Sequence, residues 1–215
     1  MRVILIRHYQ TKSNADGRII GWLDSPPGAG WKDDIDFIEG RLREQQICFD
    51  AIYSSDLQRS RNTAREYARA FDIAETIDQA ELKEINYGQL QNRSKTWAFE
   101  QYPNHKIDPD LVYPDGESFR QMQQRGARCI ASLALLHADD TILIVSHAGM
   151  IRGIICHFLD LEYAPNLQQH VPFHYIGDFL FEGENCVGYN ELGQPSGFVQ
   201  NGVIQMPFSR AYAAS

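Results

Sequence analysis

The chain has 215 residues, of which 43% are hydrophobic and 22% charged, and this composition excludes an intrinsically disordered or fibrous protein. Its 20 basic and 28 acidic residues give a formal net charge of −8 at pH 7. Because no excess of Lys and Arg is available for a phosphate backbone, we expect no nucleic-acid partner, although a small positively charged pocket is compatible with this balance.

Five apolar runs have the length and composition of strands: residues 2–6, 51–54, 141–145, 176–182 and 186–190. Apolar residues at helical spacing predict three helices: one capped by Ser55 or Asp56, one from 115–118 to about 137, and one directly after His147. Residues 25–30 (SPPGAG) predict a loop, and Asn201-Gly202 predicts a hairpin within 198–207.

Strands that alternate with helices indicate an α/β fold, a three-layer sandwich with a mainly parallel central sheet and helices on both faces. The sequence contains no repeat, low-complexity tract or linker, so we expect a single domain over 1–215. The motifs described below lie in a core of about 1–190, and the tail of about 198–215 has no predicted role.

The cysteines are widely spaced and form no Cys-x-x-Cys pair, so the sequence predicts neither a structural zinc site nor a disulfide framework. They are Cys48, Cys129, Cys156 and Cys186. Only four apolar residues separate Arg2 from Arg7, too few for a signal-peptide core, and no run of about 18 apolar residues occurs. We therefore expect a cytoplasmic protein that does not contact a membrane.

Two of the predicted strands deliver a histidine at their carboxyl ends. His8 follows the first strand together with Arg7, and His147 follows the strand at 141–145. The strand at 51–54 leads into a helix whose first turn carries Arg59. The carboxyl ends of neighbouring parallel strands share one edge of a sheet, where ligands bind. With the helix N-terminus after His147, these side chains predict an anion site, most naturally one for phosphate.

Each of these residues alone also has a structural explanation. A single histidine at a strand end is more often structural than catalytic, Arg7 could pair with a carboxylate, and Arg59 could face solvent like its neighbours in the helix. Because three strand ends all deliver such groups, we favour the interpretation in which they form one anion site over separate structural roles.

Five short motifs, in order, resemble those of the histidine phosphatase superfamily, in its phosphoglycerate mutase-like branch. The motifs are RHYQTKSN (7–14), SSDLQRSRNTA (54–64), LKEINYG (82–88), PDGES (114–118) and VSHAG (145–149). The first resembles Arg-His-Gly-x-Thr-x-x-Asn and the last Val-Ser-His-Gly-Gly. Together they cover the chain from Val3 to about Leu159.

The resemblance implies that His8 is the nucleophile of a phosphohistidine reaction and that Arg7, Arg59 and His147 hold the phosphoryl oxygens. Glu84 matches the glutamate that supplies the leaving-group proton, although its sequence context alone would suggest a surface carboxylate. The remaining matched positions, expected to contact the substrate, are Asn14, Gly21, Tyr87 and the backbone amide of Ala148. No metal or organic cofactor is implied, because the arginines and histidines supply the positive charge.

The chain departs from the family pattern in positions that bear on the substrate. Tyr9 stands where the family has glycine, and its ring either crowds the pocket or packs in the core. Ile20 stands where a polar substrate contact is common, and residues 90–92 (LQN) replace a frequent Trp-Glu-Gly. We expect Ile20, Trp22, Tyr87 and residues 91–109 to shape the subsite, but they do not identify the substrate.

Three functions remain open from the sequence. The first is a metal-independent hydrolase of a small phosphorylated metabolite, resembling a histidine acid phosphatase. The second is a phosphoglycerate-type mutase, and the third is a non-catalytic module that binds a phosphorylated ligand. The short connection between Glu84 and the motif at 114–118 favours hydrolysis, because a mutase must shield its phosphoenzyme from water. Nothing in the sequence predicts the oligomeric state.

Overall fold

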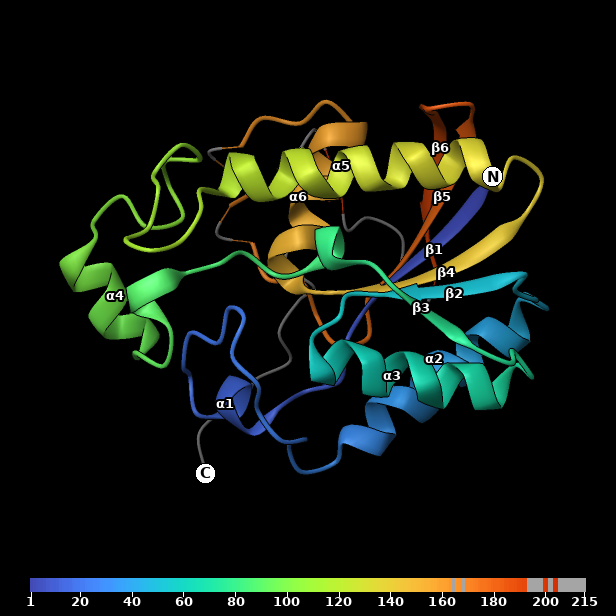
Figure 1. Ribbon diagram of the computed structural model, residues 1–215, viewed down its shortest axis with the longest axis horizontal. Coiled ribbons are helices and arrows are strands. Elements are labelled where there is room, and N and C mark those ends of the chain that lie inside the picture. The colour runs from blue at the N-terminus through green and yellow to red at the C-terminus, as the bar shows by residue number, and fades with distance from the viewer. Residues whose placement is uncertain (164, 168, 193–198, 201–202, 205–215) are drawn as a thin grey trace.

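A computed structural model describes residues 1–163, 165–167, 169–192, 199–200 and 203–204. A six-stranded sheet in the order β3-β2-β4-β1-β5-β6 forms its centre (Figure 1). The strands are β1 (Arg2–Arg7), β2 (Ala51–Ser54), β3 (Thr76–Asp78), β4 (Thr141–Ser146), β5 (Ile176–Glu182) and β6 (Asn185–Glu191). The first four in chain order pair in parallel, whereas β5 and β6 are antiparallel additions beside β1. The predicted mainly parallel sheet is confirmed.

The apolar runs of β1 and β4 are buried on both faces of the sheet. Side chains alternate between faces along a strand, so Val3 and Leu5 join one hydrophobic cluster while Ile4 and Ile6 join the other. In β4, Ile142 and Ile144 pack with the first cluster, and Leu143 and Val145 with the second. Continuous hydrophobicity, rather than alternation, is therefore the expected sequence pattern of these strands.

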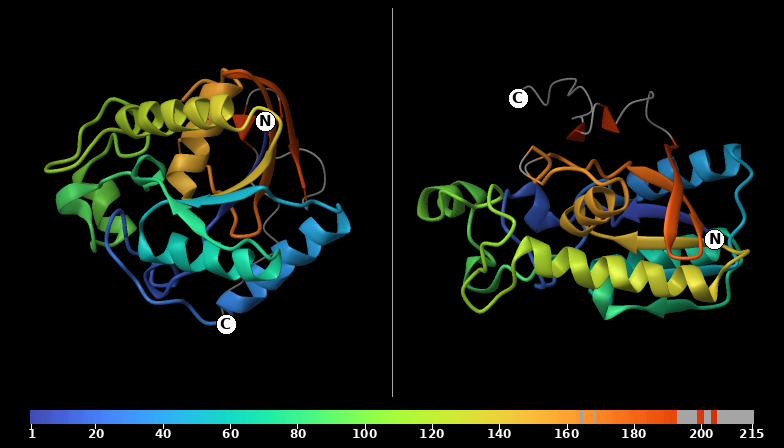
Figure 2. Two further views of the ribbon diagram at one scale, coloured as in Figure 1. Left: turned by 45° about the vertical axis from the view of Figure 1, so that its right-hand side comes forward. Right: turned by 90° about the horizontal axis from the view of Figure 1, so that it is seen from above.

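Helices cover both faces (Figures 1 and 2). On one face lie α5 (Phe119–Leu136) and α6 (Ala148–Phe158), and on the other lie α2 (Trp31–Glu44) and α3 (Gln58–Ala70). The short helices α1 (Lys12–Ala15) and α4 (Lys95–Gln101) lie beyond the end of the sheet at which β1 and β4 finish, on the left of Figure 1. Single 3-10 turns occupy Ala80–Leu82 and Gly88–Leu90. The three-layer arrangement is as predicted.

The N-termini of two predicted helices differ in how they are capped. Ser118 caps α5 in a reciprocal capping box with Gln121, within the predicted range. For α3, however, the expected cap at Ser55 or Asp56 is wrong, because the helix begins after Leu57 and has no side-chain cap. The hydroxyl of Ser55 instead lies 2.6 Å from Nε2 of His147.

The helix α2 and the strand β3 are the longest helix and the one strand of the central sheet that were not predicted. The helix α2 buries only Ile35, Ile38 and Leu42 among many charged residues, and it starts after Gly30 in a left-handed conformation. The strand β3 has only three residues and exposes Ile77, so it shows no strand pattern of its own. In the tail, β7 (Val199–Gln200) and β8 (Val203–Ile204) pair antiparallel as expected for the predicted hairpin, whose Asn201-Gly202 turn lies outside the described residues.

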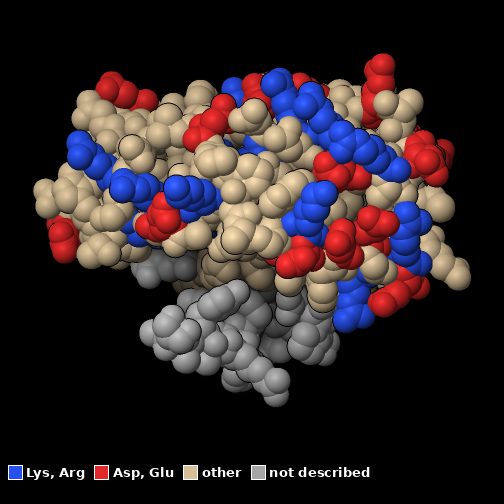
Figure 3. Space-filling model, turned by 90° about the horizontal axis from the view of Figure 1, so that it is seen from below, with Lys and Arg blue, Asp and Glu red and all other residues tan. Residues whose placement is uncertain are grey.

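Within the described ranges, no helix has both the length and the apolar character needed to cross a membrane. On the face drawn in Figure 3, acidic and basic side chains are interspersed over the right-hand side, so their charges largely offset one another there.

Candidate active site

The pairing of β1 with β4 brings the two predicted histidines together. Arg7 and Ser146 are partners in the parallel register, and the backbone amide of His8 donates to Ser146 O at 3.0 Å. Each histidine is the next residue after its strand, and the centroids of the two rings lie 5.0 Å apart. The expected convergence at the carboxyl edge of the sheet is therefore present in the structure.

His8 is held in an orientation that suits a nucleophile. Its Nδ1 lies 2.6 Å from Tyr9 O, an acceptor, so we assign the ring proton to Nδ1. Nε2 then carries the lone pair, and Arg59 Nε donates to it at 3.2 Å. Burial and the positive charges of Arg59 and Arg7 hold the pKa of His8 well below 6.5. The imidazole is thus neutral at neutral pH, with Nε2 unprotonated.

The two arginines beside His8 are buried and donate to backbone carbonyl groups. Arg59 donates through Nη2 to Gly21 O at 2.7 Å and through Nη1 to Leu23 O at 2.9 Å. Arg7 donates through Nη1 to Val171 O at 2.5 Å, and its guanidinium lies 3.7 Å from the ring centroid of Phe173. Burial lowers the pKa of Arg7 to about 9 and that of Arg59 to about 10. Both remain protonated at neutral pH and supply positive charge.

His147 is fully buried at the N-cap of α6. Ser55 Oγ accepts a hydrogen bond from the amide of Leu57 at 3.4 Å, which leaves the hydroxyl proton for Nε2 of His147 at 2.6 Å. Burial and the charge of Arg59 hold the pKa of His147 well below 6.5, so the ring is neutral, and we assign its one proton to Nδ1. Nδ1 has no partner among the described residues, so it is a donor that an anion beside His8 would satisfy.

The side chain of Glu84, which precedes α6 by more than sixty residues in the chain, contacts the N-terminus of this helix. One carboxylate oxygen accepts from the amide of Ile85 at 3.0 Å and the other from the amide of Gly149 at 3.1 Å. A Cβ atom at Gly149 would overlap Oε1 of Glu84, so this approach requires glycine. The amide of Gly149 is therefore occupied by Glu84, whereas Ala148, the residue before it, lines the cavity.

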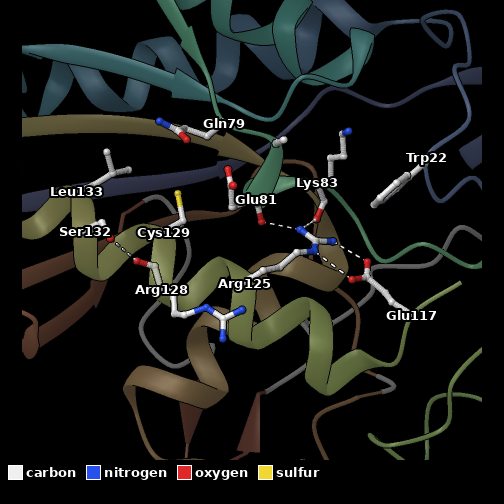
Figure 4. Close-up of a pocket in the computed structure, with 11 residues that line it drawn as sticks. Trp22, Gln79, Glu81, Lys83, Glu117, Arg125, Arg128, Cys129, Ser132 and Leu133 are labelled. Carbon is white, nitrogen blue, oxygen red and sulfur yellow. Dashed lines mark hydrogen bonds and ion pairs between the residues drawn. The ribbon is translucent and has the colours of Figure 1, made fainter.

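Arg125 of α5 holds the backbone of the segment that contains Glu84, and its contacts with Glu81, Lys83 and Glu117 can be followed in Figure 4. Arg125 donates to the carbonyl oxygens of Glu81, Lys83 and Glu84 at 2.5, 2.9 and 2.9 Å, and it pairs with Glu117 at 2.7 Å. Trp22 Nε1 adds a fourth contact, donating to Glu84 O at 2.7 Å. Trp22, Arg125 and Glu117 also line a second cavity, of about 650 Å³, together with Glu81 and Lys83 of the segment before Glu84.

A cavity of about 210 Å³ opens beside His8. Most of the residues predicted to form the site line it: Arg7, His8, Asn14, Gly21, Arg59, Glu84, Tyr87 and Ala148. The exception is His147, which is buried next to His8 and does not line the cavity. Asn14 Oδ1 accepts from the amide and hydroxyl of Thr11, which leaves Nδ2 as the group available to a ligand. The carbonyl of Gly21 holds Arg59, so its role is to position that side chain.

Comparison with known proteins assigns this arrangement to a family. The family profile described as the histidine phosphatase superfamily (branch 1) matches residues 3–184. The chain belongs to the histidine phosphatase superfamily.

Its relatives include both phosphatases and mutases. The chain is 32% identical over 159 residues to a metal-independent phosphoserine phosphatase of Arabidopsis thaliana, a match that covers 71% of this chain but only 66% of that protein, slightly under two thirds. It is also 32% identical over 166 residues to a probable phosphoglycerate mutase, GpmB, of Serratia proteamaculans, covering 75% and 76% of the two chains. The solved structure of YhfR from Bacillus stearothermophilus superposes with a TM-score of 0.75 at 26% identity, over 86% of this chain and 93% of that one.

Tyr9, the departure from the histidine phosphatase pattern that lies next to His8, points away from the cavity. Its side chain is buried in the cluster between the sheet and α2, and its ring centroid lies 4.9 Å from that of Trp31. Of the two alternatives left open by the sequence, packing in the core is therefore the one observed. The cavity beside His8 remains open to a ligand.

Several residues that line this cavity were not predicted from the sequence, or were predicted only as part of a longer segment. Lys95 and Lys106 fall within the 91–109 segment that was expected to shape the subsite, and Ile20 also lines the cavity. Arg152 was missed, although it lies four residues after Ala148 and therefore on the same face of α6. The wall formed by His170 and Phe173 has no sequence signal, because it belongs to an irregular connection between α6 and β5.

We expect stability to fall in acid because of the buried histidines. The pKa values of His8 and His147 are held well below 6.5, and burial and the charges of Lys106 and Arg152 lower that of His105 to about 4. Below pH 6.5 these three histidines bind protons in the unfolded chain but not in the native chain. Each therefore lowers the free energy of unfolding by up to about 1.4 kcal/mol for every unit by which the pH falls, and the three together by up to about 4 kcal/mol. Urea unfolding between pH 7 and pH 5 measures the slope.

The variant His8→Asn removes one of these sites and should make the slope shallower by about 1.4 kcal/mol per pH unit. His157, whose side chain is exposed on α6, provides the matched control, since His157→Asn should leave the slope unchanged. An unaltered slope in His8→Asn would contradict the assignment of a neutral imidazole.

Proposed function

We propose that the protein is a metal-independent phosphomonoesterase that hydrolyses a small phosphorylated metabolite through a phosphohistidine on His8. The observation that carries this proposal is the state of His8, whose Nδ1 is bonded to Tyr9 O while its unprotonated Nε2 lies 3.2 Å from Arg59 Nε. A nucleophile that is neutral, oriented and surrounded by cations suits attack on a phosphate dianion.

In the first step, Nε2 of His8 attacks phosphorus, the N–P bond forms and the bond from phosphorus to the ester oxygen breaks. The substrate phosphate takes over the contact that Arg59 makes with Nε2, and Arg7 and Arg59, which line the cavity, bind its non-bridging oxygens. The leaving oxygen takes a proton from the carboxyl group of Glu84, so an alcohol is released.

In the second step, water enters the position of the alcohol. The carboxylate of Glu84 accepts a proton from the water as its oxygen bonds to phosphorus, and the N–P bond breaks. Inorganic phosphate leaves, His8 is again neutral, and Glu84 is again in its acid form. Gly149 and Arg125 keep the carboxylate in one place for both proton transfers.

Hydrolysis is favoured over mutase activity by the short segment between Glu84 and Pro114. Residues 85–113 contribute one 3-10 turn and α4, and the cavity they border is lined largely by polar and charged side chains. Such a site gives water access to a phosphoenzyme, whereas a mutase must exclude it.

The test is a panel of phosphomonoesters, including p-nitrophenyl phosphate and small sugar and carboxylic-acid phosphates, assayed for inorganic phosphate at mildly acidic pH. Release of phosphate supports the proposal. Interconversion of 2- and 3-phosphoglycerate without release would indicate a mutase, and tight phosphate binding with no turnover across the panel would indicate a binding module.

A further inference from the structure

Two side chains of the second cavity contact Glu84 although neither lines the cavity beside His8. They are Trp22, in the loop before α2, and Arg125, in α5. Both donate to one atom, the carbonyl oxygen of Glu84, at 2.7 Å from Trp22 Nε1 and at 2.9 Å from Arg125 Nη2. The sequence predicts that Trp22 shapes the substrate subsite, whereas the structure places it at this second cavity.

Every N–H group of the Arg125 guanidinium has an acceptor. Two of the five bond the carboxylate of Glu117, at 2.7 and 3.1 Å. The other three bond backbone carbonyl groups, those of Glu81, Lys83 and Glu84. A lysine has only three donors and no planar fork, so it could not serve all five acceptors. The match between this guanidinium and the segment before Ile85 is therefore specific to arginine.

The peptide group between Glu84 and Ile85 connects these contacts to the proposed acid. In a trans peptide the carbonyl and the N–H point in opposite directions. Here the carbonyl accepts from Arg125 and Trp22, while the N–H donates at 3.0 Å to the carboxylate of Glu84 itself. A rotation of this peptide would turn the N–H away from the carboxylate. Satisfying loop carbonyl groups is by itself a structural role, but at this peptide it also fixes the carboxyl group.

The loop that carries Trp22 also holds Arg59. The carbonyl oxygens on either side of Trp22, those of Gly21 and Leu23, accept from Arg59 at 2.7 and 2.9 Å. Residues 21–23 therefore connect the guanidinium beside His8 with the peptide that orients the acid. A general acid must lie within hydrogen-bond reach of the leaving oxygen. A misplacement of about 1 Å can cost on the order of 10²-fold in rate.

We propose that Arg125 and Trp22 are positioning residues, which fix the carboxyl group of Glu84 for proton transfer by holding the Glu84–Ile85 peptide from outside the active-site cavity. This inference rests on the proposed phosphatase function. Neither side chain lines the cavity in which the substrate binds, so their loss should impair proton transfer and leave anion binding intact.

The test uses Trp22→Phe and Arg125→Lys, which keep an aromatic ring and a positive charge but remove hydrogen-bond donors. Because kcat/KM includes the steps up to departure of the alcohol, it measures the first proton transfer. With an alkyl phosphate that the wild type hydrolyses, we expect kcat/KM to fall by about ten-fold to a hundred-fold in each variant. With p-nitrophenyl phosphate it should hardly change, because p-nitrophenolate leaves without a proton. Inorganic phosphate should bind as it does to the wild type.

Arg128→Lys is the matched control, since Arg128 is an exposed arginine of α5 that lines the same cavity. It should keep the wild-type kcat/KM for both substrates. In a Glu84→Gln background, Arg125→Lys should cause no further loss with the alkyl phosphate, because the group that it positions is gone. Equal losses with both substrates, an additive loss in the Glu84→Gln background, or no loss with the alkyl phosphate would overturn the proposal.

Amide hydrogen exchange tests the same contacts without turnover. Gly149 lies in the first turn of α6, where amides have no acceptor within the helix, and its amide donates at 3.1 Å to the carboxylate of Glu84. This amide should exchange faster in Trp22→Phe and Arg125→Lys than in the wild type or Arg128→Lys. Trp22 is 39% exposed, so phenylalanine there should not disturb folding.

Failure of the phosphatase proposal gives a different result, namely no phosphate from any substrate of the wild type. The exchange measurement then still decides whether Arg125 and Trp22 hold the carboxyl group. Faster exchange at Gly149 in both variants would support the inference, and unchanged exchange in both would refute it.

Discussion

Replacement of His8 by alanine should abolish phosphate release, with a fall in kcat on the order of 10⁴-fold to 10⁶-fold, as for other enzymes that lose their nucleophile. The physical reason is that no other group can take its place. His147, the other imidazole nearby, has no free lone pair, because we assign its proton to Nδ1 and its Nε2 is bonded to Ser55. Steady-state release of inorganic phosphate measures the effect.

The anion pocket should survive this change, because Arg7 and Arg59 are held by backbone carbonyl groups of other segments. Inorganic phosphate should therefore still bind to His8→Ala in a calorimetric titration. His157→Ala, at an exposed histidine, is the matched control and should retain activity. Turnover by His8→Ala within ten-fold of the wild type would exclude His8 as the nucleophile.

The second large effect is expected from Glu84→Gln, and it should depend on the leaving group. Glutamine has the same size and keeps a carbonyl acceptor for one of the two amides, of Ile85 or Gly149, but it has no acidic proton to give. For an alkyl phosphate the first step should slow by about 10²-fold to 10⁴-fold, the usual contribution of general acid catalysis. For p-nitrophenyl phosphate the first step should hardly change, because p-nitrophenolate leaves without a proton.

Rapid mixing separates the two steps. With p-nitrophenyl phosphate, Glu84→Gln should release a burst of one p-nitrophenol per active site, followed by slow turnover, since the attacking water has also lost its base. No burst of alcohol should appear with an alkyl phosphate. Glu81→Gln, which changes an exposed carboxylate of the same segment, should behave like the wild type. Equal slowing of the first step with both substrates would show that Glu84 is not the acid.

The part of the site that lies at strand ends could be predicted from the sequence. Two buried apolar strands, each followed by a histidine, have to lie side by side for their ends to meet, and the parallel pairing of β1 with β4 meets this condition. The motifs then identified Arg59 and Glu84, which the strand pattern alone would not have separated from surface residues.

Side-chain hydrogen bonding was harder to predict, because one polar residue can satisfy several partners. Ser55 has the residue type and position of a helix cap, yet its hydroxyl is bonded to His147 and the cap of α3 is Leu57, two residues later. The amide of Gly149 likewise binds Glu84, a residue 65 positions earlier in the chain. Local sequence contains no information about such distant partners.

The walls of the cavity were the least predictable part. Arg7 and Arg152 each donate to a backbone carbonyl in the 169–173 segment, so side chains from a strand and a helix fix an irregular loop. Backbone acceptors carry no residue signature. The substrate preference of the protein therefore depends on residues that only the folded structure brings together.

The most direct test is detection of the phosphoenzyme during turnover. Protein mixed with substrate, quenched in base and digested with trypsin should carry phosphate on peptide 8–12, whose only histidine is His8. We predict that mass spectrometry finds this modification, that acid removes it, and that it is absent from His8→Ala. Phosphate on another peptide, or acid-stable phosphate on Tyr9 or Thr11, would contradict catalysis through His8.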